Sequence, residues 1–199
     1  MRIATWNVNS VLARLPRLVE WLEQAGPDVV CLQETKVGAD AFPAGAVTPL
    51  GYAVAHDGEG RWNGVAVLSR VGLENVARGL PADPGPPSGR PEARTIAATC
   101  GPVRVRSVYV PNGRAPDDPN YPYKLRWLAG LRAAVAAEAG SGRPFAVMGD
   151  FNVAPTDADV WDPAVFVGST HVTPAERAAL AALRETGLTD VVPRNAPAR

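Results

Sequence analysis

Apolar and polar positions follow one another along this chain in a pattern typical of alternating strands and helices. An apolar run of β type at residues 2–8 precedes helical spacing over 10–26, and a continuous apolar run covers 28–34. A Gly-Pro pair closes the helical segment, and Pro16 must lie in its first turn or bend it. Because a continuous apolar run indicates a strand buried on both faces, the opening predicts two neighbouring strands of a layered α/β domain.

The same patterns predict the remaining elements. Further strands are expected at residues 51–56, 63–69, 94–100, 103–110 and 143–150, and further helices at 123–140 and 170–187. A Gly-Pro turn at 101–102 suggests a hairpin, and the Pro/Gly-rich residues 81–91 are expected to form an exposed, poorly ordered loop. In the last helix Thr173 is the expected N-cap, with Pro174 as the first helical residue and Glu176 completing a capping box.

Four of the predicted strands end in polar side chains. These residues are Asn7, Glu34, Tyr109 with Asn112, and Asp150 with Asn152. Taken singly, an Asp or Asn after a strand is more often a simple turn residue. In α/β sheets, however, ligands collect beyond the strand ends, where side chains leave the packed interior but remain held by a rigid scaffold. All four endings together therefore predict a functional site.

The residue types narrow the chemistry of that site. Oxygen donors predominate and the sequence has no Cys/His cluster, which favours Mg²⁺ or Mn²⁺ over zinc. Mg²⁺ commonly takes one or two carboxylates, and Glu34 suits that role. For phosphoryl chemistry, Asp150 could orient or deprotonate water, Asn152 and Asn7 could contact the phosphate, and Tyr109 offers a phenol. No Gly-rich nucleotide cradle or nucleophile elbow is present in the sequence.

Length and charge set further limits. The 199 residues suit one domain spanning 1–199. Twenty basic residues, nearly all Arg, balance 20 acidic ones, which argues against a basic tail but allows a local basic rim. The expected phosphate neighbours are Lys36, Arg94, Asn112 and Arg114, although each taken alone is more often a solvated charge or a turn residue.

The cysteines, the histidines and the N-terminus complete the expectations. Cys31 and Cys100 lie in apolar runs, which favours buried free thiols over a disulfide. His56 stands beside an Asp-Gly turn and is expected to be solvated, while His171 precedes a capped helix and is expected to have a surface or capping role. The N-terminus lacks the apolar stretch of a signal peptide, and no apolar run reaches roughly 18 residues. We therefore expect a soluble cytoplasmic protein with no membrane partner.

Several of these segments carry a family resemblance. The segments are TWNVNS, DVVCLQETK, NGVAVLS, YVPNG and GDFNVAPTDAD, and the final GLTD at 187–190 also fits. They resemble the exonuclease III family of bacterial AP endonucleases, within the endonuclease/exonuclease/phosphatase superfamily, with matching spacing along the chain. The resemblance implies a four-layer α/β sandwich of two packed mixed sheets flanked by helices.

The resemblance also implies roles for the strand-end residues. Asn7 and Glu34 would lie at a metal, with Asp150 and Asn152 completing the metal-binding set. Tyr109 would contact the phosphate, Asp150 would act on the attacking water, and Asn152 would stabilise the transition state. The implied activity is Mg²⁺-dependent hydrolysis of double-stranded DNA in base-excision repair, by cutting 5′ to abasic sites and trimming 3′ ends.

Part of the family's catalytic centre does not occur in these residues. The family's later strands carry a segment of the type RIDY with a further Asp and a final SDH, and neither occurs in this sequence. A positioned acid–base group contributes about 10²–10⁴-fold to a rate. We therefore expect a truncated member, incomplete at its C-terminus, with weak or no activity by itself.

Two other functions stay open from the sequence. A superfamily relative could act on RNA or a small phosphate ester, although LQETK and YVPNG favour the DNA-repair branch. A non-catalytic DNA-binding remnant would bind duplex DNA with an affinity that falls steeply with salt, and would not cleave it. The oligomeric state and the balance between endonuclease and exonuclease action also remain open.

Overall fold

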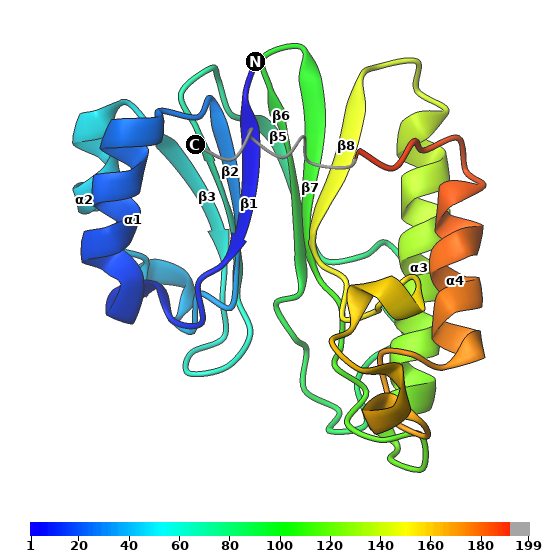
Figure 1. Ribbon diagram of the computed structural model, residues 1–199. Helices are drawn as coiled ribbons and strands as arrows, with labels where there is room; N and C mark the ends of the chain where they lie inside the picture. The colour runs from blue at the N-terminus through cyan, green and yellow to red at the C-terminus, as the bar shows by residue number, and fades with distance from the viewer. Residues whose placement is uncertain (192–199) are drawn as a thin grey trace.

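Two four-stranded sheets pack face to face, and helices cover the outer face of each sheet (Figure 1). The computed structural model describes residues 1–191. Its layers run from α1 and α2 through the first sheet and the second sheet to α3 and α4. This arrangement confirms the layered α/β domain predicted from the residue patterns and the sandwich of two mixed sheets that the family resemblance implies.

The first sheet has the strand order β1-β2-β4-β3. Its strands are β1 (Ile3–Asn7), β2 (Val29–Gln33), β3 (Ala53–Asp57) and β4 (Val65–Ser69). Strands β1 and β2 are parallel neighbours, as predicted, whereas β4 is antiparallel to β2 and to β3. Helices α1 (Val11–Ala25) and α2 (Ala44–Val47) cover its outer face. Ser10 caps the start of α1 and Gly26 its end, and Pro16 lies inside the helix, beyond its first turn.

The continuous apolar run of β2 is explained by burial on both faces. Val30 and Leu32 pack into the cluster beneath α1, while Val29 and Cys31 pack into the cluster between the two sheets. Successive side chains of a strand point to opposite faces, so each face of β2 receives every second residue. Cys31 and Cys100 are both buried free thiols, as predicted.

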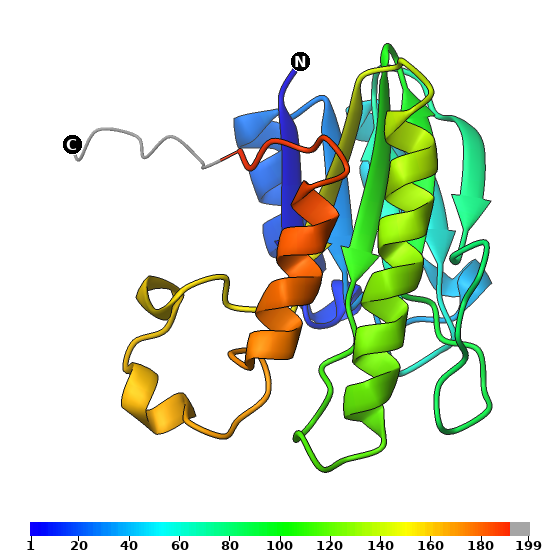
Figure 2. The same ribbon diagram turned by 90° about the vertical axis from the view of Figure 1, so that its right-hand side faces the viewer.

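The second sheet has the strand order β5-β6-β7-β8. Its strands are β5 (Glu74–Arg78), β6 (Thr95–Cys100), β7 (Val103–Tyr109) and β8 (Phe145–Asp150). The predicted hairpin between β6 and β7 is confirmed, and β7 runs parallel to β8. Strand β5 was not predicted. Helices α3 (Asn120–Ala139) and α4 (Pro174–Arg184) lie side by side over the outer face (Figure 2).

The helix boundaries follow local signals. Helix α4 has the predicted capping box of Thr173 and Glu176. Helix α3 begins three residues before the expected start, and Gly140 follows its last residue as expected. Short 3-10 helices are η1 (Ala39–Ala41), η2 (Thr48–Leu50), η3 (Asp157–Asp159) and η4 (Pro163–Phe166). Within residues 1–191, no helix is both long and apolar enough to cross a bilayer.

The strand directions bring four strand ends together. Strands β1 and β2 are parallel, β7 and β8 are parallel, and β1 of the first sheet contacts β8 of the second. The carboxyl ends of all four strands lie at the same end of the sandwich, at the bottom of Figure 1. The polar residues that follow these strands are therefore presented to one region.

Gly149 is required for β8 to pack beside β7. Its φ is +146°, and a Cβ atom built there would lie 2.0 Å from the carbonyl oxygen of Val108. We expect Gly149→Ala to lower the free energy of unfolding by at least about 3 kcal/mol, because backbone strain and a backbone clash act together. Urea unfolding measures this loss.

Gly142 offers the matched control for that substitution. Its φ is also positive, at +72°, but nothing lies within 4 Å of a Cβ atom there. Gly142→Ala should lower the free energy of unfolding by only about 1–2 kcal/mol, the strain of placing alanine in the left-handed backbone conformation. Equal losses for the two variants would contradict the steric account of Gly149.

Candidate active site

One amide group connects the two carboxylates predicted to form the site. Nδ2 of Asn7 donates to Oε1 of Glu34 at 2.7 Å and to Oδ2 of Asp150 at 2.9 Å. Asn7 ends β1, Glu34 follows β2 and Asp150 ends β8, so the contact joins both sheets. Asn7 and Asp150, which are 143 positions apart in the sequence, are thus joined by a hydrogen bond.

The loop after β2 aims Glu34 at this position. Glu34 and Lys36 both have φ of +54°, and Thr35 between them is fully buried. The Glu34 carbonyl accepts from the backbone of Ser10 at 2.7 Å, and the Thr35 N–H donates to the carbonyl of Gly64 at 3.2 Å. A Cβ atom at Gly64 would lie 2.1 Å from the Thr35 hydroxyl, so this loop packs tightly between α1 and the β3–β4 connection.

The prediction that His56 is solvated is wrong. Its side chain is buried, with Nε2 at 2.9 Å from the Thr35 hydroxyl and Nδ1 at 3.1 Å from the Ala39 carbonyl oxygen. Both partners belong to the segment that follows β2. His56 therefore supports the loop that carries Glu34, and the neighbouring Asp-Gly turn does not bring its ring into water.

Burial of His56 has a measurable consequence. Desolvation lowers its pKa below the ordinary 6.5, only partly offset by its hydrogen bond to Ala39. As pH falls below 6.5, the unfolded chain binds this proton before the folded protein does, so stability falls until pH reaches the lower folded pKa. An NMR titration should give His56 a pKa below 6.5, and His56→Gln should remove its share of this acid destabilisation.

His171, the other histidine of the chain, supplies the control. Burial, followed by the charge of Lys124, lowers its pKa as well. His171→Gln should therefore leave the His56 share in place, and only the double variant should lose both. A His56 ring that titrates at its ordinary pKa would show that it is not buried against Thr35.

Glu34 is held in its charged form. Burial alone would raise its pKa, but hydrogen bonds from Asn7 and Lys36 and the charge of Lys36 outweigh it, so the pKa lies below its usual range. Lys36 Nζ lies 2.8 Å from Oε2 of Glu34 and also donates to Asn9. Lys36 thus lies beside the carboxylates with its ammonium paired to Glu34, and its role as a phosphate neighbour stays a prediction.

Tyr109 ends β7 beside the same carboxylates. Burial, together with the nearby charge of Glu34, raises the pKa of Tyr109 to about 12, so it stays a phenol at neutral pH. Arg94 lies over its ring at 5.0 Å from the centroid and donates to its carbonyl at 3.3 Å. Arg94 is also paired with Glu92 at 2.5 Å, which partly commits the guanidinium predicted to bind substrate.

Asp150 and Asn152 are fixed as a unit after β8. The backbone N–H of Asn152 donates to Oδ1 of Asp150 at 3.0 Å, and Asn152 has φ of +49°. The Asn152 side-chain amide donates to the Val110 carbonyl at 2.9 Å. These contacts turn the chain sharply after β8 and hold both side chains near the end of β7.

Asn112 lies at the exposed rim of this region. Its Nδ2 is 3.1 Å from Nε2 of His171, and its Oδ1 accepts from the backbone of Arg114 at 3.0 Å. The Arg114 side chain is 72% exposed. The N-cap of α4 is Thr173, whereas His171 donates its backbone N–H to Glu176 in the first turn of the helix. The contact of the His171 ring with Asn112 was not predicted.

Sequence reasoning also missed Lys124. This fully buried lysine donates to the carbonyls of Asn112 at 3.1 Å and Asn152 at 2.5 Å, and it pairs with Glu176. A signal was present, because Lys124 shares the helical spacing of the buried Leu128 and lies at a position where an apolar residue is expected.

The donor set fits a hard divalent cation. Residues 1–191 contain no group of three or more His, Cys, Asp and Glu side chains arranged to hold a metal ion. Two carboxylates with neighbouring amides suit Mg²⁺, which is bound through one or two carboxylates and keeps several waters. Asn7 turns its N–H groups to the carboxylates and its Oδ1 to Asn9, so the amide must rotate for its oxygen to bind a cation.

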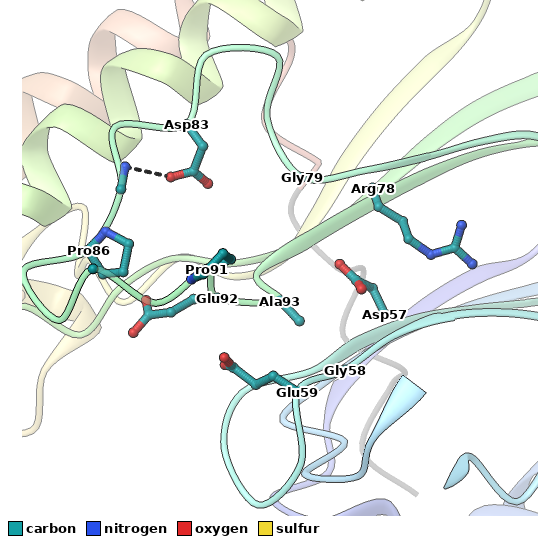
Figure 3. Close-up of a pocket in the computed structure, with 12 residues that line it drawn as sticks. Asp57, Gly58, Glu59, Arg78, Gly79, Asp83, Pro86, Pro91, Glu92 and Ala93 are labelled. Carbon is teal, nitrogen blue, oxygen red and sulfur yellow. Dashed lines mark hydrogen bonds between the residues drawn. The ribbon is translucent and has the colours of Figure 1, made fainter. Parts of the chain in front are cut away.

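A separate cavity of about 530 Å³ lies between the β3–β4 connection and the Pro/Gly loop (Figure 3). The loop residues 81–91 are largely exposed, as predicted. The cavity is lined by four acidic side chains, Asp57, Glu59, Asp83 and Glu92, against one basic side chain, Arg78, and none of the predicted site residues lines it. Its charge disfavours a phosphate, so the strand ends remain the candidate site.

Known proteins have similar sequences and the same fold. The model of the endonuclease/exonuclease/phosphatase family matches residues 4–197. Exodeoxyribonuclease III of Haemophilus influenzae is 30% identical over 96% of this chain and 74% of its own length. The 3′-5′ exonuclease NExo of Neisseria meningitidis is 41% identical, with a TM-score of 0.90 over 96% of this chain and 73% of its own.

A structure of NExo from Neisseria, described as a 3′ phosphatase, is bound to a product DNA hairpin. An AP endonuclease from Archaeoglobus fulgidus is 34% identical, with a TM-score of 0.87 over 93% of this chain and 70% of its own. The sequence match over nearly the whole chain and the structural agreement both indicate the same family. The chain belongs to the endonuclease/exonuclease/phosphatase family, in its branch of exonuclease III-like hydrolases.

Proposed function

We propose that this protein is a Mg²⁺-dependent phosphodiesterase that acts on double-stranded DNA at abasic sites or 3′ ends in base-excision repair. The observation that carries the proposal is the Asn7 amide that joins Glu34 to Asp150 across the two sheets. The related proteins named for exodeoxyribonuclease and AP endonuclease activity support the choice of DNA. Mn²⁺ could replace Mg²⁺ at the same oxygen donors.

Each residue of the site has a proposed role in this reaction. Glu34 and Asn7 would hold the cation, with Asp150 and Asn152 beside them; when bound, the cation would polarise a phosphate oxygen. Asp150 accepts a proton from the attacking water, because its carboxylate is fixed by Asn7 and Asn152. The phenol of Tyr109 and the amide of Asn152 donate to phosphate oxygens, and Lys36, Arg94 and Asn112 bind the DNA backbone around them.

We also propose that these 199 residues alone cleave DNA slowly or not at all. They contain no Asp-His pair of the SDH type, and neither histidine takes its place: His56 is turned to Thr35 and His171 to Asn112. Without a positioned acid for the leaving oxygen, a rate reduction of about 10²–10⁴-fold is expected. The expected compartment is the cytoplasm.

Cleavage of an end-labelled duplex with a single abasic site tests both statements. We expect Mg²⁺-dependent cleavage far below that of exodeoxyribonuclease III under the same conditions, with the cut 5′ to the abasic site or with trimming from the 3′ end. Turnover equal to that relative would refute the weak activity. Hydrolysis of RNA or small phosphate esters but not of the duplex would favour a different substrate class.

A non-catalytic DNA-binding protein is the second candidate function. The predicted DNA-backbone contacts Lys36, Arg94 and Asn112 are present in this sequence, whereas an Asp-His pair of the SDH type is not. Duplex binding that weakens steeply with salt, without cleavage in Mg²⁺ or Mn²⁺, would identify it.

A further inference from the structure

Lys124 of α3 and Glu176 of α4 form an ion pair in which both side chains are completely buried. Burying two charges is costly, and replacing such a pair with uncharged side chains of similar volume is often neutral or stabilising. A contribution to stability alone therefore does not explain why the protein has this buried ion pair. Lys124 is also one of only two lysines in a chain whose other basic residues are arginines.

The Lys124 ammonium lies where two loops of the candidate active site meet. It donates to the carbonyl of Asn112, in the loop after β7, and to the carbonyl of Asn152, in the loop after β8. A lysine ammonium has three donors and no acceptor, so the third can serve Glu176. One buried group thus links the main chain of two site residues to a helix of the outer layer.

Glu176 fixes the other end of this connection. Its Oε1 accepts from the Thr170 hydroxyl at 2.7 Å and the His171 N–H at 2.9 Å, and its Oε2 accepts from the N–H of Thr173 at 3.1 Å. Burial would raise the pKa of Glu176, but hydrogen bonds from Lys124 and Thr170 hold it below its usual range. The Glu176 carboxylate is therefore charged, and hydrogen bonds to both of its oxygens hold it in place.

We propose that the Lys124–Glu176 pair is a positioning unit that sets Asn112 and Asn152 relative to each other. Neither side chain reaches solvent, so neither contacts DNA. The geometric part of this inference stands apart from the proposed function, and only its catalytic consequence rests on it. A misplacement of about 1 Å can cost about 10²-fold in rate, which gives the pair a large effect from a distance.

The geometric part is tested without activity. The side-chain amide resonances of Asn112 and Asn152 are recorded in metal-free wild type, Lys124→Met and Lys124→Met/Glu176→Gln. We expect both resonances to shift in the two variants, while the double variant recovers the melting temperature lost by the single one, since glutamine still suits a capping box. Unshifted resonances in folded Lys124→Met, or resonances restored together with the melting temperature, would overturn the proposal.

The catalytic part is tested on the abasic duplex. Lys124→Met should lower kcat by about 10²-fold and leave the salt dependence of duplex binding unchanged, whereas Lys36→Met should reduce the magnitude of the salt slope by about 1. An altered slope in Lys124→Met would make it a phosphate contact and overturn the inference. If wild type neither binds nor cleaves the duplex, the proposed function fails while the amide resonances still decide the positioning.

Discussion

Asp150→Asn is expected to lower whatever rate of duplex cleavage the wild-type chain reaches by about 10²–10⁴-fold. Asp150 ends β8, and its two oxygens accept from Asn7 and from the backbone of Asn152. Asparagine keeps the size of the side chain and one acceptor oxygen, so the loop should hold its shape. It cannot accept a proton from water, so the loss should fall on kcat. Single-turnover cleavage of a labelled duplex measures it.

Asp157→Asn is the matched control for this substitution. Asp157 lies in η3, shortly after Asp150 in the sequence, and its carboxylate pairs with Arg177 at 2.8 Å. The same charge is removed from the same part of the chain, yet the rate should stay within a factor of about 3, because surface substitutions usually cost little. If the Asp150→Asn variant cleaves at the wild-type rate, Asp150 does not take part in the reaction.

Glu34→Gln is expected to weaken Mn²⁺ binding by at least about 10- to 100-fold, the loss that follows when even outer partners of a metal ligand are removed. Glu34 is the carboxylate that Asn7 and Lys36 hold in its charged form. Glutamine keeps one oxygen but loses the negative charge that a divalent cation needs. Isothermal titration calorimetry with Mn²⁺ measures the change.

Glu59→Gln controls for charge alone. Glu59 lies in the β3–β4 connection and contacts Asn63, whose carbonyl accepts from the backbone of Lys36. Glu59→Gln removes one negative charge, as Glu34→Gln does, but from a neighbouring loop. The affinity for Mn²⁺ should therefore stay unchanged. Equal losses in the two variants would mean that the cation responds to overall charge and is not bound at Glu34.

The parts of the fold that could be predicted are those with local signals. The run through β2 is apolar at every position because both of its faces are covered, and the turn residues after β1, β2 and β8 follow directly in the sequence. Strand β5 was missed because only Val76 of its five residues is even partly buried, so the chain there shows no alternation. Edge position, not composition, makes it a strand.

Buried polar residues were the ones that local patterns could not place. His56 looks solvated beside an Asp-Gly turn, yet its ring bonds to Thr35, 21 residues away. Lys124 shares the helical spacing of the buried Leu128, yet that spacing does not show that its partner is Glu176, which lies 52 residues further along the chain. Hydrogen bonds that join distant segments decide such burial, and a single sequence does not show which segments meet.

The placement of Glu34 beside Asp150 is a different case, because the polar strand ends predict a shared site without predicting its geometry. Parallel pairing within each sheet and the contact of β1 with β8 bring the strand ends together. The contact between the sheets follows from the packing of their inner faces around residues such as Val67 and Ile96. The strand pattern alone does not predict this packing, and the packing is what brings Glu34 beside Asp150.

Crystals grown with Mn²⁺ and a short duplex give the most direct measurement. The anomalous difference map should contain one strong peak against the Glu34 carboxylate, with Asn7 and Asp150 around it and a backbone phosphate on its open side. A peak bound at other side chains, or a phosphate seated away from Glu34 and Asp150, would contradict the assignment of this strand-end cluster as the site of hydrolysis.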